Sequence, residues 1–378
     1  MMTVYLRGLV LLFSFLLSSC GQDADTQSGE NNAPENNALE NNALEDNVSP
    51  SISEKESAVS IHRKPVVRRQ VISRELAQDD TIEPFRTIPI DGDILDLVVA
   101  GMQLLVASNG FFEVYNLEDF ERIRRQNFEK IENFYGDLHL PRLFSADISP
   151  SGRQIVFVKE TAGGKSVVQL QEASSLTTLI AESANLAIRK IRFLDEDSLL
   201  MATIESEVIL FDLKESVVVY KHQLSLSSFS DFSINLENHQ VVLADESGAI
   251  PYFGGDFGKI DYLLEGGNLD KIFDIDIAKK KIITGGKDRS VSIYNLESGV
   301  VDKYLTDFYI YAVALDENAE QAIFILDEDN HVGLFDIKAK KITAILHGDG
   351  KSLGFLTFIS DHQALGATYN QIFLWSFR

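Results

Sequence analysis

From residue 85 to the end of the chain, hydrophobic and polar positions alternate in short runs that predict β-strands. The runs are rich in Val, Ile, Leu, Tyr and Phe, and turn signals such as Gly, Asn, Asp and Ser separate one run from the next. No segment carries the apolar period of an amphipathic helix over a sustained length. The pattern therefore predicts an all-β domain over residues 85–378.

A strand-like run that ends in a large apolar residue and a small polar one recurs along this domain. The clear copies are Tyr115-Asn116, Phe211-Asp212, Tyr294-Asn295, Phe335-Asp336 and Trp375-Ser376, and the weaker ones are Leu170-Gln171 and Tyr252-Phe253. Successive copies are 55, 41, 41, 42, 41 and 40 residues apart. After the first gap this spacing matches the period of about 40–45 residues of WD40-type propeller blades, which have four strands each. Seven copies predict a seven-bladed WD40-like β-propeller.

The last blade is expected to be completed by a strand from the other end of the domain. Only three residues follow Trp375, so the seventh blade lacks its fourth strand. The run 85–90 (FRTIPI) precedes the first blade and has no blade of its own. We expect residues 85–90 to fill the vacant place, because closing the ring removes the exposed strand edges of an open array.

The first residues predict a lipoprotein signal peptide over positions 1–19. The apolar run 8–17 is about half the ~20 residues that a helix needs to span a bilayer. The motif 17–20 (LSSC) then resembles the bacterial lipobox, in which the cysteine receives lipid, so we expect lipidation at Cys20. Because Gly21 rather than Asp follows, we expect an outer-membrane anchor facing the periplasm. The alternative is an ordinary cleaved signal peptide in which the cysteine has no role.

Residues 20–84 predict a tether and a linker between the anchor and the propeller. Positions 21–60 are rich in Asn, Glu, Ser and Ala and repeat the motifs ENNAP, ENNAL and ENNAL, so burial cannot offset the entropy of ordering them. The basic run 62–74 (HRKPVVRRQVISR) is either a solvated linker or a contact for anionic head groups or an acidic partner. The expected organisation is a signal peptide at 1–19, a disordered tether and basic linker at 20–84, and a propeller at 85–378.

The charge balance excludes nucleic acid as the main partner. The 378 residues include 34 Lys and Arg against 57 Asp and Glu, a formal net charge of −23, which repels a phosphate backbone. The single cysteine excludes an internal disulfide, a zinc site built from several thiolates and a CxxC redox pair. Stability must therefore come from packing.

No motif indicates catalysis, a cofactor or a metal ion. The seven histidines form no HExxH motif and no close pair, there is no nucleophile elbow, and the chain has a single Trp, whereas quinone-cofactor propeller enzymes repeat this residue. The acids 327–329 lack the spacing of an EF-hand, which favours an exposed hairpin over a calcium site. Asp288 and Asp329 each stand six residues before their aromatic residue and are expected to be structural turn residues. We predict no catalytic residue, no cofactor and no metal.

One departure from the repeat indicates a partner surface. The first gap of 55 residues places about 14 extra residues within 120–142 (FERIRRQNFEKIENFYGDLHLPR), a basic and aromatic segment of an acidic protein. Insertions in propellers lie in loops on one face and often bind partners. Phe134, Tyr135, His139 and Arg142 are the candidate partner-binding residues. The alternative is a surface decoration without a partner.

The signal sequence, the seven degenerate blades and two strand-rich runs carry a family resemblance. Residues 191–213 (IRFLDEDSLLMATIESEVILFDL) and 284–299 (TGGKDRSVSIYNLESG) resemble the NapL-type WD40 accessory proteins that are encoded with periplasmic nitrate reductases. The resemblance extends over about residues 85–378. It implies a non-enzymatic protein-interaction scaffold in the periplasm that assists nitrate reductase through contacts with its subunits or maturation factors. It supplies no site residues.

Two other functional classes remain open. A lipid anchor also fits a propeller resembling the lipoprotein that assists outer-membrane protein assembly. A hydrolase or lyase that uses the central channel is the less favoured class, since it requires titratable side chains from several blades to converge in a deep pocket with shifted pKa values.

Overall fold

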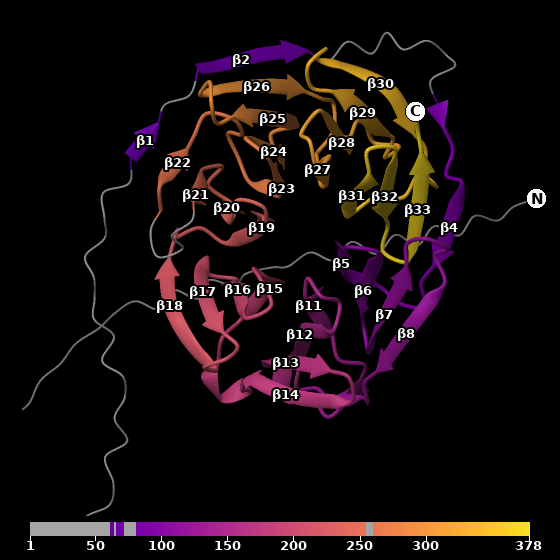
Figure 1. Ribbon diagram of the computed structural model, residues 1–378, viewed down its shortest axis with the longest axis vertical. Helices are drawn as coiled ribbons and strands as arrows, with labels where there is room; N and C mark the ends of the chain where they lie inside the picture. Colours follow the sequence, from indigo (N-terminus) through magenta and orange to yellow (C-terminus); the bar gives the residue numbers. More distant parts are fainter. Residues whose placement is uncertain (1–60, 64–65, 72–80, 255–259) are drawn as a thin grey trace, which may run out of the picture. The chain divides into compact units, whose positions relative to one another are not determined.

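The alternating runs fold into strands that pair in sequence order. The structure is a computed structural model and describes residues 61–63, 66–71, 81–254 and 260–378. Within these residues, seven sheets of mainly antiparallel strands, which we call blades 1 to 7 in chain order, are arranged in a ring (Figure 1). The prediction of an all-β, seven-bladed propeller is confirmed.

Each blade contributes four strands, which follow one another from the channel to the rim. Blades 1 and 2 contain β5 (Ile94–Ala100), β6 (Gln103–Ser108), β7 (Phe111–Asn116), β8 (Arg122–Asn127), β11 (Leu143–Ile148), β12 (Gln154–Glu160), β13 (Ser166–Glu172) and β14 (Ser175–Ile180). Blades 3 and 4 contain β15 (Ile188–Phe193), β16 (Ser198–Thr203), β17 (Glu207–Asp212), β18 (Val217–Gln223), β19 (Phe229–Asn235), β20 (Gln240–Asp245), β21 (Ile250–Gly254) and β22 (Tyr262–Leu264). Blades 5 to 7 contain β23 (Ile272–Ala278), β24 (Lys281–Gly286), β25 (Ser290–Asn295), β26 (Val300–Leu305), β27 (Val313–Leu315), β28 (Gln321–Ile325), β29 (Val332–Asp336), β30 (Lys341–Leu346), β31 (Phe355–Ser360), β32 (Gln363–Ala367), β33 (Gln371–Ser376) and β4 (Arg86–Pro89).

Burial differs between the middle and the rim of a blade and explains the repeat. In blade 1 the middle strands β6 and β7 are buried at nearly every position, because neighbouring blades cover both of their faces. The rim strand β18 of blade 3 is instead exposed at most positions. The recurring sequence element is the end of the third strand of each blade, which is one of the two largely buried middle strands.

Hydrophobic clusters join each blade to the next and extend around the whole ring. Among the described residues there are seven such clusters, one for each pair of neighbouring blades. The cluster between blades 7 and 1 contains Ile88, Leu104 and Leu374, so the two ends of the domain share one core. Burial of these apolar side chains is the main stabilising contribution to the ring.

The ring closes with the strand that the sequence analysis assigned to it. Strand β4 pairs antiparallel with β33, and Ile88 lies opposite Ile372. The amides of Phe85 and Ile90 extend this pairing by donating to the carbonyl oxygens of Leu374 and Asn370, both at 2.9 Å. The predicted completion of the last blade by residues 85–90 is therefore confirmed.

The segment before β4 differs from the expected linker. Residues 61–82 contribute three short strands, β1 (Ile61–Arg63), β2 (Val66–Val71) and β3 (Thr81–Ile82), to the part of the chain that was assigned to a tether. They pair in parallel with β22, β26 and β30, the rim strands of blades 4, 5 and 6. Rim strands present unpaired backbone groups, and a passing chain can satisfy them. We call β1 to β3 the strap; Cys20 and the rest of residues 1–60 lie outside the described residues.

Helical structure is confined to two short 3₁₀ turns in the described residues, η1 (Ala162–Gly164) and η2 (Glu182–Ala184). In the described part of the chain, no helix has the length and apolar character needed to cross a membrane.

Candidate functional site

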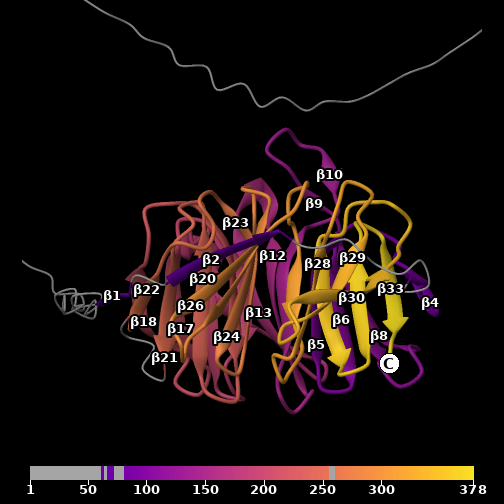
Figure 2. The same cartoon turned by 90° about the horizontal axis from the view of Figure 1, so that it is seen from above.

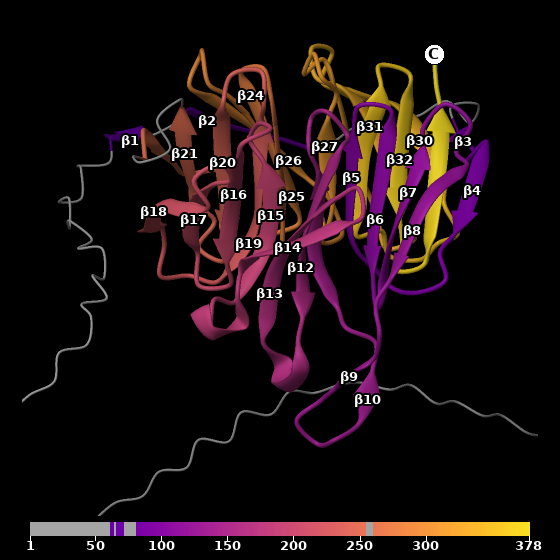
Figure 3. The same ribbon diagram turned by 60° about the horizontal axis from the view of Figure 1, so that its bottom comes forward.

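The insertion between blades 1 and 2 is a hairpin that projects from one face of the ring. Strand β9 (Ile131–Glu132) pairs antiparallel with β10 (Leu138–His139), and the hairpin extends beyond the neighbouring loops (Figures 2 and 3). The side-chain oxygen of Asn133 accepts hydrogen bonds from the amides of Tyr135 and Asp137, both at 2.9 Å. Asn at the start of a turn forms such bonds readily, so the tip has a defined shape.

Both legs of the hairpin are held by one glycine of blade 1. The amide of Gly110 donates to the carbonyl of Pro141 at 2.8 Å, and its carbonyl accepts from the amide of Phe128 at 2.8 Å. Gly110 has a φ of +82°, and a Cβ atom there would lie 2.8 Å from the side chain of Leu140. Only glycine fits this backbone and this close approach, which fixes the base of the hairpin to the propeller.

The tip presents apolar side chains to solvent. The side chains of Phe134 and Tyr135 are 87% and 85% exposed and meet edge to face with ring centroids 5.7 Å apart. Leu138, which the sequence analysis did not single out, is 65% exposed beside them. Adjacent exposed apolar side chains on a projecting element are typical of a binding surface.

The other two candidate residues lie at the base of the hairpin. His139 Nε2 is 3.3 Å from Glu160 Oε1, and the amide of Arg142 donates to Glu160 Oε2 at 3.1 Å. His139 and Arg142 are therefore brought together by Glu160 of β12, whereas Phe134 and Tyr135 form a separate group at the tip. The four candidates divide into a contact group and a supporting group.

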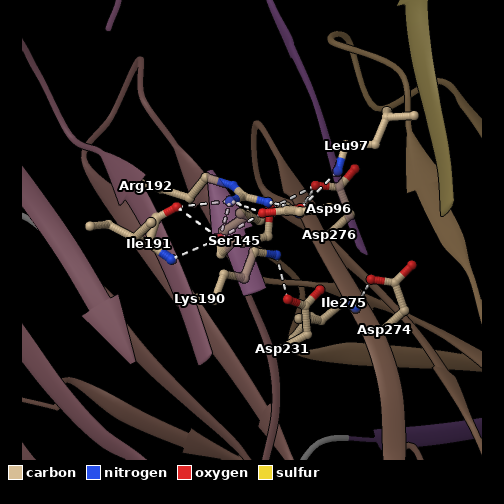
Figure 4. Close-up of polar contacts among 12 residues, drawn as sticks. Asp96, Leu97, Ser145, Lys190, Ile191, Arg192, Asp231, Asp274, Ile275 and Asp276 are labelled. Carbon is tan, nitrogen blue, oxygen red and sulfur yellow. Dashed lines mark hydrogen bonds and ion pairs between the residues drawn. The ribbon is translucent and has the colours of Figure 1, made fainter. Parts of the chain in front are cut away.

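A second candidate site is the central channel, which encloses a cavity of about 670 Å³. The innermost strands of all seven blades line it, and several of their charged side chains converge there (Figure 4). None of these residues was among the candidates predicted from the sequence. The one available signal was a polar residue at alternate positions of otherwise apolar inner strands, and that pattern is common in exposed strands as well.

An ion pair in the channel links three blades. Arg192 of β15 donates from two nitrogens to the two carboxylate oxygens of Asp96 on β5, each at 2.8 Å. Ser145 of β11 stands between them and donates to Asp96 Oδ2 at 2.6 Å. Burial by itself would raise the pKa of Asp96, but the charge and hydrogen bonds of Arg192 outweigh it and hold that pKa below its ordinary value. The same pair raises the pKa of Arg192.

A second group of charges lies beside this pair. Lys190 forms an ion pair with Asp231 of blade 4. Burial, followed by the negative charge of Asp231 and a hydrogen bond to it, raises the pKa of Asp274 on blade 5 well above its ordinary value. Burial and the charge of Asp231 therefore favour the protonated form of Asp274.

Two more buried carboxylates join neighbouring blades through backbone amides. Asp147 of β11 accepts from the amide of Ile148 at 2.9 Å and from the amide of Phe193 in the next blade at 2.7 Å. Asp276 of β23 accepts from the amide of Leu315 in the next blade at 2.9 Å. Burial raises the pKa of Asp147 to about 6 and also raises that of Asp276. These side chains fasten one inner strand to the next.

The two expected turn aspartates behave differently. Asp288 accepts hydrogen bonds from Asn268 Nδ2 at 2.9 Å, Ser290 Oγ at 2.6 Å and Lys303 Nζ at 2.7 Å, which confirms its structural role. Burial would raise the pKa of Asp288, but these donors outweigh burial and lower it. Asp329 also lies in a turn, as expected, but it is exposed and accepts no hydrogen bond from any described residue.

A solved structure shares this architecture. The C-terminal WD40 domain of Sif2 superposes with a TM-score of 0.60 and 15% sequence identity, over 75% of this chain and 81% of that chain. No protein-family model matches the chain, and no curated protein matches it in sequence. At this level of identity the likeness concerns the fold, and it establishes a WD40-like β-propeller.

Proposed function

We propose that the protein is a non-enzymatic protein-interaction scaffold that binds its partner with the tip of the β9–β10 hairpin. The observation that carries this proposal is the pair Phe134 and Tyr135, whose rings are almost fully exposed on a hairpin with a fixed base. A rigid propeller supplies the support, and aromatic side chains on a preordered loop bind at a low cost in entropy. WD40 propellers commonly present such surfaces to protein partners.

The finer part of the proposal concerns the partner and the location. We propose an accessory role for periplasmic nitrate reductase, with a lipid on Cys20 that anchors the protein on the periplasmic side of the outer membrane. Support comes from the LSSC motif at 17–20 and from the resemblance of residues 191–213 and 284–299 to NapL-type proteins. The alternative partner class is the machinery that assembles outer-membrane proteins.

Cross-linked affinity capture from nitrate-grown cells tests the proposal. The wild-type protein is compared with a Phe134→Ala/Tyr135→Ala variant and with a Leu226→Ala/Leu269→Ala control, whose leucines are also exposed. We expect nitrate reductase subunits or maturation factors with the wild type and the control, and at least about tenfold less with the hairpin variant, because aromatic anchors dominate interface energy.

Two other outcomes of this capture would contradict the hairpin as the binding surface or the identity of the partner. Equal capture by the wild type and the hairpin variant would remove the hairpin as the binding surface. Enrichment of barrel-assembly components instead of nitrate reductase would favour the outer-membrane assembly class and would leave the scaffold function in place.

One observation favours a second candidate function. Asp147 lines the channel cavity with a pKa of about 6, a value suited to general acid or base catalysis in a hydrolase or lyase. One observation argues against catalysis by Asp147. Both of its carboxylate oxygens accept hydrogen bonds from backbone amides, so the carboxylate already serves to join two blades. Turnover of chromogenic esters or glycosides that disappears in Asp147→Asn would favour catalysis. No turnover would favour a structural role in which Asp147 joins two blades.

A further inference from the structure

The loop between β28 and β29 of blade 6 brings together side chains that the sequence analysis treated separately. Asp327, Asp329 and His331 each offer one ligand atom, and these atoms all lie within 4.8 Å of one another. His331 Nδ1 is 3.0 Å from Asp327 Oδ2. The donor set is mixed, two carboxylates and one imidazole, and differs from a simple acidic hairpin.

The equivalent loop of blade 5 shows that this arrangement is not needed to form the turn. Arg289 in blade 5 and Asn330 in blade 6 adopt the same left-handed backbone, with φ of 57° and 59°. In blade 5, Asp288 precedes this residue and is held by hydrogen bonds, one of them from Ser290. In blade 6 a histidine replaces that serine, and Asp329 makes no hydrogen bond with any described residue. The turn is shared by the two blades, but its side chains differ. In blade 6 Asp327 accepts a hydrogen bond from the amide of His331 at 3.2 Å and contacts its imidazole, and Asp329 is left free to take another ligand.

A buried oxygen beside the cluster lacks a partner. Asn330 is only 7% exposed, and its Nδ2 donates to the carbonyls of Glu328 and Gly350, both at 3.2 Å. Its Oδ1 has no hydrogen-bond partner among the described residues. Buried polar atoms in proteins are nearly always satisfied, so this oxygen can accept a hydrogen bond from a ligand or from a water molecule in the same loop.

We propose that Asp327, Asp329 and His331 form a binding site for a divalent first-row transition-metal ion such as Zn²⁺. Zinc binds carboxylate oxygen and imidazole nitrogen at about 2.0–2.2 Å, which places neighbouring tetrahedral ligands roughly 3.3 Å apart. The Asp327 to His331 distance of 3.0 Å is close to that separation. Two carboxylates neutralise the charge of the ion, and solvent supplies the remaining ligands.

A second histidine supports the first. The rings of His331 and His347 stack with centroids 4.6 Å apart, and His347 Nδ1 is 3.2 Å from Glu83 Oε1, just after strand β3 of the strap. The amide of His347 also donates to the carbonyl of Ile82 at 2.9 Å. His347 is a positioning residue, because its stack restricts the ring of His331 and connects the loop to the strap.

Calorimetric titration of the full chain with Zn²⁺ tests the site. We expect saturable binding of one ion and at least about tenfold weaker binding in His331→Ala and in Asp329→Asn, since even the loss of supporting residues around metal ligands costs about 10–100-fold. His362→Ala removes an exposed histidine elsewhere and is expected to bind like the wild type. Zn²⁺ should also raise the Tm of the wild type by more than it raises that of Asp329→Asn.

Defined results would overturn the proposal. Asp329 is exposed and unbonded among the described residues, so Asp329→Asn should fold normally without metal, and a loss of binding cannot be assigned to misfolding. Zn²⁺ affinities that are equal in the wild type, His331→Ala and Asp329→Asn would show an adventitious surface ion only. Tighter binding of Ca²⁺ than of Zn²⁺ would mean that oxygen atoms alone hold the ion and that His331 is not a ligand.

Discussion

Asp96 of blade 1 and Arg192 of blade 3 form a two-pronged ion pair across blade 2, with both nitrogen-to-oxygen distances at 2.8 Å. The side chains are 9% and 16% exposed, so both charges are largely removed from water. Because the partners belong to blades that are not neighbours, the pair connects three consecutive sheets at the channel. It supplements the hydrophobic clusters, each of which joins only two blades.

Replacing one partner of this pair should destabilise the fold strongly. Asp96→Asn removes the charged partner that binds both nitrogens of the buried Arg192 guanidinium, and we expect a loss of about 3–5 kcal/mol in the free energy of unfolding. Urea denaturation at neutral pH measures it. Lys214→Ala, which removes an exposed ion pair with Asp197, is the control and should cause no measurable change. Equal stability of the two variants would contradict the assigned role.

The buried carboxyl of Asp147 should make stability fall as pH rises. Its pKa is about 6 in the folded chain against an ordinary value of 3.8, so the folded state holds the proton more tightly than the unfolded state does. This contribution is present at low pH and is lost as pH rises through about 6. Asp147→Asn keeps this side chain neutral at every pH. The free energy of unfolding of the variant, measured relative to that of the wild type, should therefore rise by up to about 3 kcal/mol from pH 4 to pH 7.

Denaturation of both proteins across this pH range checks the prediction. Glu118→Gln changes an exposed carboxylate and should follow the wild-type profile in parallel. A constant difference between Asp147→Asn and the wild type from pH 4 to pH 7 would show that Asp147 titrates normally.

The two turn aspartates provide a matched pair of substitutions. Asp288→Ala removes the acceptor of Lys303, whose side chain is 4% exposed, and should cost about 3–5 kcal/mol because a buried ammonium is left unpaired. Asp329→Ala, at the equivalent position of blade 6, should not change thermal stability measurably in the absence of metal. Thermal melts of the two variants in a chelating buffer compare them directly, and similar losses would contradict the distinction.

Ring closure should depend on the apolar face of β4. Ile88 is 8% exposed and lies opposite Ile372, so Ile88→Ala is expected to cost about 2–5 kcal/mol. The adjacent Thr87 is exposed, and Thr87→Ala is the control. Hydrogen exchange should show faster opening of β33 in Ile88→Ala than in the control. Unchanged exchange in β33 would mean that blade 7 does not rely on β4.

The architecture was predictable because the middle strands of the blades are largely buried between neighbouring blades. Such burial requires an aromatic or large apolar residue at positions such as Tyr294 and Phe335. The spacing of these residues therefore gives the number of blades. The strap was not predictable, since β1 to β3 pair through backbone groups and need no distinctive side chains. Its composition resembles that of a solvated linker.

The sites were predictable only where they interrupt the repeat. The extra residues between blades 1 and 2 revealed the hairpin, whereas the division between its tip and its base depends on Glu160, which is distant in sequence from Phe134. The channel charges occupy one or two positions in each of several blades, so no local spacing connects Asp96 to Arg192. His331 and His347 likewise meet only after two strands of blade 6 have folded.

The pairing of β4 with β33 also sets the order of events during synthesis. Strand β4 leaves the ribosome early, but its partner follows about 280 residues later, a delay on the order of 15–60 s at ordinary rates of translation. Throughout this interval the edge of β4 has no neighbour, and the blades already synthesised cannot close the ring. A chaperone or a membrane-bound export pathway that shields this edge would have its greatest effect on the yield of folded protein, and it would leave the stability of the finished molecule unchanged.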